Sequence, residues 1–380
     1  MSTPSLLMPP TRMARIAQAR QLALMGETQL THGLIEPWIE QSWQRCLSQG
    51  QRPEHRVLFE AASSQHMRQT LECNRTLVQA ARPILNQLGS ALADTHYFAL
   101  LTNQDGVVVD VDGPIDRSDR RVDLITRIGT DLSEQSVGTT AIGAALHLQQ
   151  PVWLHRGEHF FNDTSVYSCA GAPLFGPDGR CVGMLDLTGV EATERPELRH
   201  LVVHTARTIE NALVLQRPHT LLLRLNWPGL PLGDEGDGLM GLDADGFVTA
   251  ANGAARHMLP PLATAGAALH CRDLFALPTD LLFDAARHHS AGLDVPLWSG
   301  LRLQVQARMA QRTHEAAPPS TWPAAAPTQP AAPRLPLKDV ETALIHKAVE
   351  EARGNVAEAA LALGISRATV YRKLGSGKVR

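Results

Sequence analysis

A short stretch near the C-terminus contains the residues of this chain best suited to bind a polyanion. Ser366 can cap a helix from Arg367 to Leu374, in which Val370 and Leu374, four residues apart, form the apolar side. The opposite side then carries Arg367, Thr369, Tyr371, Arg372 and Lys373. Arg and Lys bond guanine edges or phosphates, and Thr contacts a base or the thymine methyl group. The stretch therefore predicts a DNA-reading helix.

The residues before this helix predict how it is held. Asn355 and Glu358 form a capping-box variant at the start of a helix that runs from Val356 to Leu363. Gly364 follows at the position where helices commonly end in a left-handed residue. A helix, a short turn containing glycine and a second helix predict a helix-turn-helix. Residues 334–380 carry nine basic and five acidic side chains in a chain of net charge −3, so this segment alone attracts phosphate.

A second constellation could bind metal. His155, Glu158 and His159 match the H-x-x-E-H pattern of inverted zinc proteases. That chemistry needs both histidines on one face of a continuous helix, whereas here a strand-like run leads into the motif and Gly157 lies at its centre. We expect a loop that lines or covers a pocket, with no metal and no cofactor.

Aromatic and sulfur-containing residues gather around the same stretch. The candidate effector pocket comprises Trp153, His155, Phe160, Phe161, Tyr167 and Cys169. Such side chains often contact ligands, although core packing explains them about as well. Cys169 and Cys181 fall on neighbouring expected strands, so a redox role is an alternative to the simple packing that buried cysteines usually have.

Composition narrows the class of protein. The chain is 44% hydrophobic and 19% charged, which is typical of a globular protein. Five cysteines without a C-x-x-C pair favour a reducing compartment. No apolar run approaches 18 residues and no signal peptide is recognised, so we expect a cytoplasmic protein without membrane contact. No catalytic triad is recognisable, so we expect a protein that is not an enzyme.

The period of the apolar residues predicts the elements of the first half. Residues 34–95 are helical, and two hairpins follow at 97–111 and 172–187, each with a turn that contains glycine. Between the hairpins lie an expected helix at 136–148 and a strand at 151–155. A long helix at 194–217, with Leu198, Val202, Ile209 and Leu213 on one face, completes an α+β sandwich.

The remaining segments complete a multidomain α+β chain. The expected order is a loose N-terminal arm at 1–34, the helical lead-in and sandwich at 35–217, a smaller α+β unit at 229–310, a linker at 313–336 and an all-α helix-turn-helix at 337–380. The linker has seven prolines and seven alanines in 24 residues, a composition that cannot pack a core.

Two resemblances cover most of the chain. Residues 354–374 resemble the Fis-type DNA-binding domain, in which the first helix helps to form a dimer and the last enters the major groove. The run Glu40-Gln41-Ser42-Trp43-Gln44-Arg45-Cys46 and the run Val137-Gly138-Thr139-Thr140-Ala141-Ile142-Gly143 resemble regulators of the acetoin-catabolism, sigma-54-dependent activator family, whose sensor is a GAF domain. The unit around 241–260 is similar to a degenerate PAS-like repeat. The resemblance implies a small-molecule pocket between sheet and helices.

The chain departs from that family in one major respect. The central ATPase that remodels the sigma-54 polymerase is absent, because no G-x-x-x-x-G-K-[ST] loop precedes a helix and Gly375-Ser376-Gly377-Lys378 lies at the extreme C-terminus. Leu132 also stands where the family tends to have Trp. ATP hydrolysis and the identity of the effector are therefore not carried over.

Together these features predict a ligand-responsive transcriptional regulator. Its expected partners are double-stranded DNA with a palindromic operator, a small-molecule effector, a second copy in a homodimer and RNA polymerase. Two alternatives stay open: a GAF-fold redox or metal enzyme with secondary DNA binding, and an accessory antagonist of a full-length paralogue.

Overall fold

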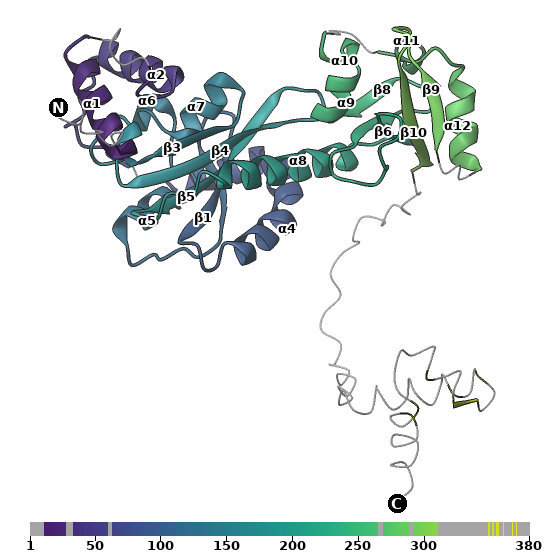
Figure 1. Ribbon diagram of the computed structural model, residues 1–380, viewed down its shortest axis with the longest axis horizontal. Coiled ribbons are helices and arrows are strands. Elements are labelled where there is room, and N and C mark those ends of the chain that lie inside the picture. The colour runs from purple at the N-terminus through teal and green to yellow at the C-terminus, as the bar shows by residue number, and fades with distance from the viewer. Residues whose placement is uncertain are drawn as a thin grey trace, which may run out of the picture. The chain divides into compact units, whose positions relative to one another are not determined.

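The structure is a computed structural model that describes residues 11–27, 33–59, 63–264, 269–288 and 292–310 (Figure 1). In the C-terminal segment it describes Val349, Ala352, Asn355, Val356, Ala360, Arg367 and Val370. The chain divides into two compact units, residues 1–312 and 313–380.

A five-stranded antiparallel sheet forms the centre of the first half. Its strands are β1 (Tyr97–Asn103), β2 (Val108–Asp112), β3 (Val152–His155), β4 (Tyr167–Phe175) and β5 (Cys181–Val190), in the order β2-β1-β5-β4-β3. Gly106 and Gly179 turn the two hairpins with φ of +82° and +83°, a backbone conformation in which glycine carries no steric penalty. Both expected hairpins are confirmed.

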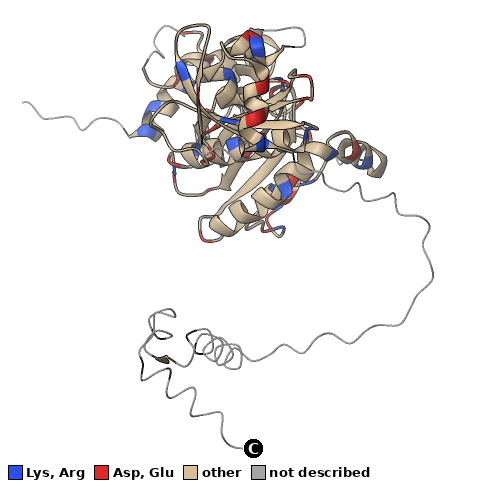
Figure 2. Ribbon diagram, turned by 90° about the vertical axis from the view of Figure 1, so that its right-hand side faces the viewer, with Lys and Arg blue, Asp and Glu red and all other residues tan. Residues whose placement is uncertain are grey.

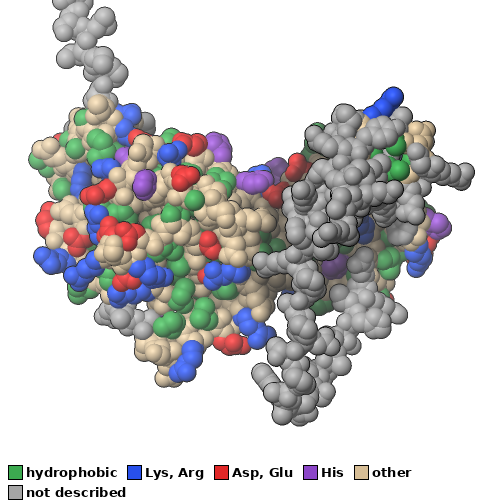
Figure 3. All heavy atoms as spheres, turned by 90° about the horizontal axis from the view of Figure 1, so that it is seen from below, with side chains coloured by type: hydrophobic (Ala, Val, Ile, Leu, Met, Phe, Trp, Pro, Cys, Tyr) green, Lys and Arg blue, Asp and Glu red, His purple; other side chains and the backbone are tan. Residues whose placement is uncertain are grey.

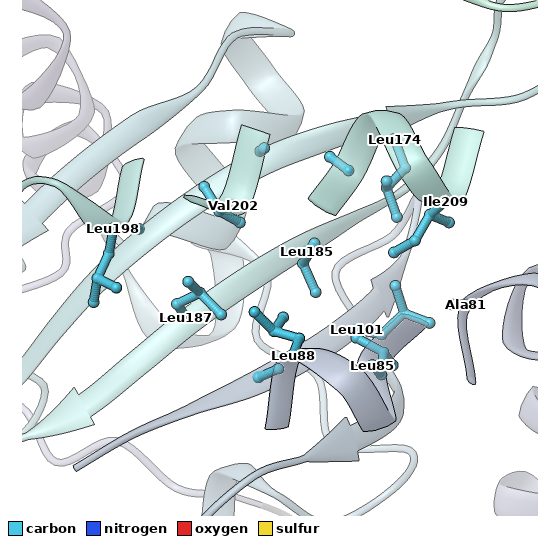
Figure 4. Close-up of a cluster of buried hydrophobic side chains, with 14 of the residues drawn as sticks. Ala81, Leu85, Leu88, Leu101, Leu174, Leu185, Leu187, Leu198, Val202 and Ile209 are labelled. Carbon is cyan, nitrogen blue, oxygen red and sulfur yellow. The ribbon is translucent and has the colours of Figure 1, made fainter. Parts of the chain in front are cut away.

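Helices cover both faces of this sheet. On one face lie α4 (Arg75–Ala91) and α8 (Leu198–Gln216), and on the other lie α5 (Arg120–Ile125), α6 (Glu134–Val137) and α7 (Ala141–Leu148). Figure 4 shows Leu88 of α4 and Val202 of α8 directed at Leu185 and Leu187 of β5. The predicted apolar stripe of α8 is buried here. The expected α+β sandwich, an antiparallel sheet flanked by helices, is confirmed.

Three more helices precede the sheet: α1 (Arg12–Leu24), α2 (Pro37–Ser48) and α3 (Ser64–Cys73). The described part of the N-terminal arm is not loose, which corrects the expectation for residues 1–34. Thr11 caps α1, whose Ile16, Ala19 and Ala23 recur at helical spacing and are buried. Ala19 and Ala23 pack in a cluster with Trp43.

A second antiparallel sheet follows α8. It contains β6 (Leu221–Asn226), β7 (Gly238–Leu242), β8 (Val248–Ala251), β9 (Leu293–Pro296) and β10 (Arg302–Met309), in the order β8-β7-β6-β10-β9. Its helices are α9 (Gly253–Met258), α10 (Pro261–Thr264), α11 (Cys271–Leu274) and α12 (Thr279–Arg287). The central strand β6 begins at Leu221, so the expected boundary at 229 is wrong: the alternate leucines of β6 belong to this core.

Four of the described residues of the C-terminal unit form a small apolar cluster. Ala360 and Val370 are buried, with Val349 and Val356 packed against them. The inward side chain predicted for Val370 is confirmed, and helical Arg367 is exposed. The expected linker at 313–336 and the reading-helix residues Thr369, Tyr371, Arg372 and Lys373 lie outside the described residues.

Candidate functional site

A small cavity lies between the first sheet and the helices α5, α6 and α7, on the sheet face opposite α8. Its volume is about 30 Å³. Because one water needs roughly 10–15 Å³ on this measure, the cavity has room for about two waters. Most of its wall is apolar, formed by Phe59, Leu100, Ile125, Leu132, Val137 and Ile142. Polar side chains interrupt this wall at a few points.

Asp186 places a carboxyl group in the cavity wall. It lies on β5, in the middle of the sheet, and is fully buried. The Thr188 hydroxyl donates to Oδ2, whereas Oδ1 has no hydrogen-bond partner among the described residues. Burial raises the pKa of Asp186 to about 7, opposed by the bonds from Thr188 and Cys169. The group can therefore accept or, when protonated, donate a hydrogen bond to a molecule in the cavity.

His159 supplies a second unused polar atom. Its Nδ1 lies 2.9 Å from the Arg156 carbonyl oxygen, so Nδ1 carries the proton and donates. Burial lowers the pKa of His159 to about 4, and the ring is neutral. Nε2 is then a bare acceptor, and no described residue pairs with it. Since buried polar atoms are costly without partners, Nε2 and Oδ1 of Asp186 mark the places where a ligand would bond.

The loop that carries His159 is held by the N-terminal helices. It includes the 3₁₀ turn η2 (Arg156–Glu158). Arg20 of α1 donates to the carbonyl oxygens of His159, at 2.7 Å, and of Phe160. Arg12 pairs with the buried Glu158 at 2.8 Å, and the indole of Trp43 donates to the Glu158 carbonyl at 2.9 Å. We call residues 156–164 the cavity loop.

The segment from Glu134 to Thr140, which contributes Val137 and Thr140 to the cavity wall, is held by contacts with α2. The Ser42 hydroxyl donates to Glu134 at 2.6 Å, and Arg45 forms an ion pair with the same carboxylate at 2.6 Å. Ser42 also lies 2.7 Å from the Thr139 hydroxyl. Thr140, which caps α7, lines the cavity. The two motifs quoted from the sequence, around Ser42 and around Thr139, are therefore halves of one contact.

The structure brings only part of the expected pocket together. Tyr167 and Cys169 line the cavity. Trp153 belongs instead to the core under α8, and His155 is buried with Nδ1 2.8 Å from the Ser168 hydroxyl. Phe160 and Phe161 also lie outside the cavity lining, packed with the helices α1 and α2.

The sequence does not predict Asp186 and Thr188 as cavity residues. A signal was present for Asp186, because a carboxyl group within the apolar run Met184-Leu185-Asp186-Leu187 is unusual for a central strand. His159 belongs to the stretch that is expected to line or cover a pocket, and its ring lines the cavity.

The geometry does not support zinc chemistry at the H-x-x-E-H pattern. His155 ends a strand and Glu158 lies in a 3₁₀ turn, where Arg12 and the His155 amide occupy its carboxylate. No cluster of three or more His, Cys, Asp or Glu side chains suited to a metal occurs among the residues that the structure describes. Burial raises the pKa of the Cys169 thiol far above its ordinary value, which disfavours the reactive thiolate.

Acidic and basic residues alternate along the ribbon in Figure 2, and charged side chains of both signs are interspersed on the visible part of the face that Figure 3 shows. These views show no patch of a single sign. No described helix is long and apolar enough to cross a membrane.

Comparisons with known proteins assign two parts of the chain. The model of the MimR N-terminal domain matches residues 17–211, and that of the bacterial regulatory protein Fis family matches residues 336–375. The two matches agree with the sensor and reader resemblances, and the interval between them holds the second sheet.

Similar proteins include the acetoin catabolism regulatory protein of Cupriavidus necator, 31% identical over 231 residues, which are 58% of this chain and 34% of that protein. The acetoin dehydrogenase operon activator AcoR of Bacillus subtilis is 28% identical, over 46% of this chain and 29% of that protein. The propane 2-monooxygenase operon activator MimR of Mycolicibacterium goodii is 27% identical, over 52% of this chain and 33% of that protein. The chain therefore spans about a third of these relatives. The DhaR(N)–DhaL complex of E. coli aligns over 72% of this chain and 100% of that chain, with 17% identity and a TM-score of 0.45.

Proposed function

This chain belongs to the family of the MimR N-terminal domain, and from that premise we propose that it is a ligand-responsive transcriptional regulator. The observation that carries the proposal is the presence, on one chain, of a sensor with unsatisfied polar atoms in a small cavity and of a Fis-family reader at 336–375. It acts on DNA in the cytoplasm, and it does so without ATP hydrolysis, since no phosphate-binding loop lies between the two matched segments.

We place the effector in the cavity between Asp186 and His159. Both residues offer free acceptor atoms, and the cavity lining contains no Lys or Arg to pair with an anion. The geometry therefore favours a small uncharged molecule with hydroxyl groups, which donates to Oδ1 and Nε2. Because the cavity has room for about two waters, binding of such a molecule must displace side chains of the apolar wall. Two relatives are named for acetoin and one for propane 2-monooxygenase, and these names suit a small uncharged effector.

Effector binding is proposed to change how two readers are presented to a palindromic operator. In a homodimer, two reading helices would contact half-sites roughly 34 Å apart, and RNA polymerase would respond to the occupied operator. The effector would shift the population between two packings of α8 across the dimer. Because the cavity faces away from α8, this coupling passes through the sheet strands β4 and β5.

The experiment is a thermal-shift screen of small alcohols, diols and hydroxyketones on the full chain, with each hit retested for its effect on DNA affinity in a gel shift. A hit that raises the melting temperature and changes DNA affinity supports the proposal. If none of the compounds that stabilise the protein changes its affinity for DNA, ligand control is refuted.

The interval between the two family matches also suits a second candidate function. The relatives are about three times as long as the part that matches this chain. In this chain the interval between the sensor match and the reader match holds a small sheet. Such a chain could form mixed dimers with a full-length relative and reduce its activation. Co-purification of tagged chain with that relative, and loss of its activation, distinguish this role from a regulator that acts alone.

A further inference from the structure

A groove of about 510 Å³ lies where α8 passes from the first sheet to the second. Its walls are the middle of α8, the end of β4 and the helix α9. This volume falls within the range of about 300–1,000 Å³ that small-molecule sites occupy. Partly buried Phe175, Trp227 and Met258 give it an apolar side. The groove is separate from the effector cavity, which lies on the other face of the first sheet.

Glu210 of α8 is a buried carboxyl group in this groove. Its Oε1 accepts from the Phe175 amide at 2.9 Å, at the point where the pairing of β4 and β5 shifts register. Oε2 has no hydrogen-bond partner among the described residues. A Cβ added to Gly253 of α9 would lie 3.5 Å from Oε2, so this oxygen points across the groove. One oxygen of Glu210 therefore serves the fold, and the other is available.

Arg207 provides a positive charge beside it. Residues three apart on a helix are neighbours, with Cβ atoms about 5–6 Å apart. Arg207 is exposed, lines the same groove and lowers the pKa of Glu210 against the larger effect of burial. Yet no ion pair joins Arg207 to Glu210, or to any other acid of the described part. The two opposite charges lie close enough to interact, but no ion pair joins them.

Two other polar side chains of the groove, Asn252 and Glu235, already have partners. The Asn252 amide donates to Asn211 at 2.7 Å, and the Glu235 carboxylate accepts from Thr208 at 2.8 Å and pairs with His204 at 2.9 Å. These bonds join α8 to the second sheet. Glu210 and Arg207 are the acidic and basic side chains of the groove that form no ion pair among the described residues, and the exposed His257 also lines the groove.

We propose that the groove binds a zwitterion with an apolar tail, such as an α-amino acid. The ammonium group donates to Oε2 of Glu210, the carboxylate pairs with Arg207, and the tail packs on Trp227 and Met258. Since the walls come from both sheets, the bound molecule bridges them.

Isothermal titration of the full chain with three matched probes tests this. L-norleucine carries both charges, n-pentylamine lacks the carboxylate, and hexanoate lacks the ammonium. We expect norleucine to bind about tenfold or more tighter than either other probe, as expected for one charge-assisted hydrogen bond. The proposal is overturned if norleucine does not bind, or if it binds no tighter than pentylamine or hexanoate.

Variants assign the two charges. Glu210→Gln keeps an acceptor for the Phe175 amide. It should weaken the binding of norleucine about tenfold and leave the affinity for hexanoate unchanged. Arg207 is exposed, so its replacement should leave the fold intact. Arg207→Gln should weaken the binding of norleucine and of hexanoate but not that of pentylamine. Glu197→Gln, an exposed acid before α8 and outside the groove lining, is the matched control. If both groove variants bind norleucine with unchanged affinity, the proposal is overturned. That result would not bear on the proposed DNA binding, which is measured separately.

Discussion

Asp186 stands where the packing of a central strand would otherwise place an apolar side chain. The neighbours Leu185 and Leu187 are directed at α8, and the carboxyl group faces the cavity on the other side of the sheet. Its free Oδ1 costs stability in the empty protein. Retaining such a group is explained if a ligand completes its hydrogen bonds.

Asp186→Asn tests this through the pH dependence of stability. The folded-state pKa of about 7 lies above the ordinary value of 3.8. Between these values the folded protein holds a proton that the unfolded chain has lost, so the stability contributed by the protonated group disappears as the pH rises through 7. At pH 8 the variant should exceed the parent by on the order of 3 kcal/mol in unfolding free energy, and by much less at pH 5.

Urea unfolding of both proteins at the two pH values measures this difference. An equal gain at pH 5 and pH 8 would show that Asp186 is not a titrating buried carboxyl group. The variant also presents an amide donor to the cavity, so the thermal shift caused by a hydroxylic effector should shrink or vanish.

At the reading helix, Arg367 is the exposed basic residue that the structure describes. If it bonds a guanine edge, Arg367→Ala should relax the preference at one base pair by about 1–3 kcal/mol. Competition gel shifts with single-base operator variants, at fixed salt, measure the preference. Arg287→Ala on α12 is the control. Uniform weakening over all sequences would instead assign Arg367 to the phosphate backbone.

At the scale of elements, α1 and the cavity loop act as one piece. Arg20 joins them through the carbonyls of His159 and Phe160, although burial lowers the pKa of its guanidinium. Arg20→Gln should lose about 1–3 kcal/mol of unfolding free energy and increase hydrogen exchange in residues 156–164. Arg15→Gln on the exposed side of α1 is the control. Unchanged exchange in the loop would show that α1 does not hold it.

Much of this element structure follows from periodicity. The long helix α8 and both hairpins are predicted correctly, because a local pattern determines each of them. For α8 that pattern is the apolar stripe Leu198, Val202, Ile209 and Leu213, and for the hairpins it is the glycine turns. The packing of α1 could not be predicted, since its small buried residues give a weak pattern until Phe160 and Trp43 form the partner surface. The same holds for His159, whose role depends on a distant helix holding its loop.

At the scale of the molecule, the sensor unit and the reader are distinct compact units. The expected Pro/Ala linker at 313–336 predicts tethering, with a reach of roughly 75 Å if fully extended. Tethering predicts that the reader keeps most of its affinity for DNA when the effector is absent.

DNA occupancy by the full chain, compared with a chain that ends at residue 336, tests the central claim. Chromatin immunoprecipitation of tagged proteins in the same cells gives the occupied sites and their palindromes. We predict discrete sites for the full chain and none for the shortened chain, with both present at equal levels. Undiminished occupancy by the shortened chain would contradict the assignment of residues 337–380 as the DNA reader.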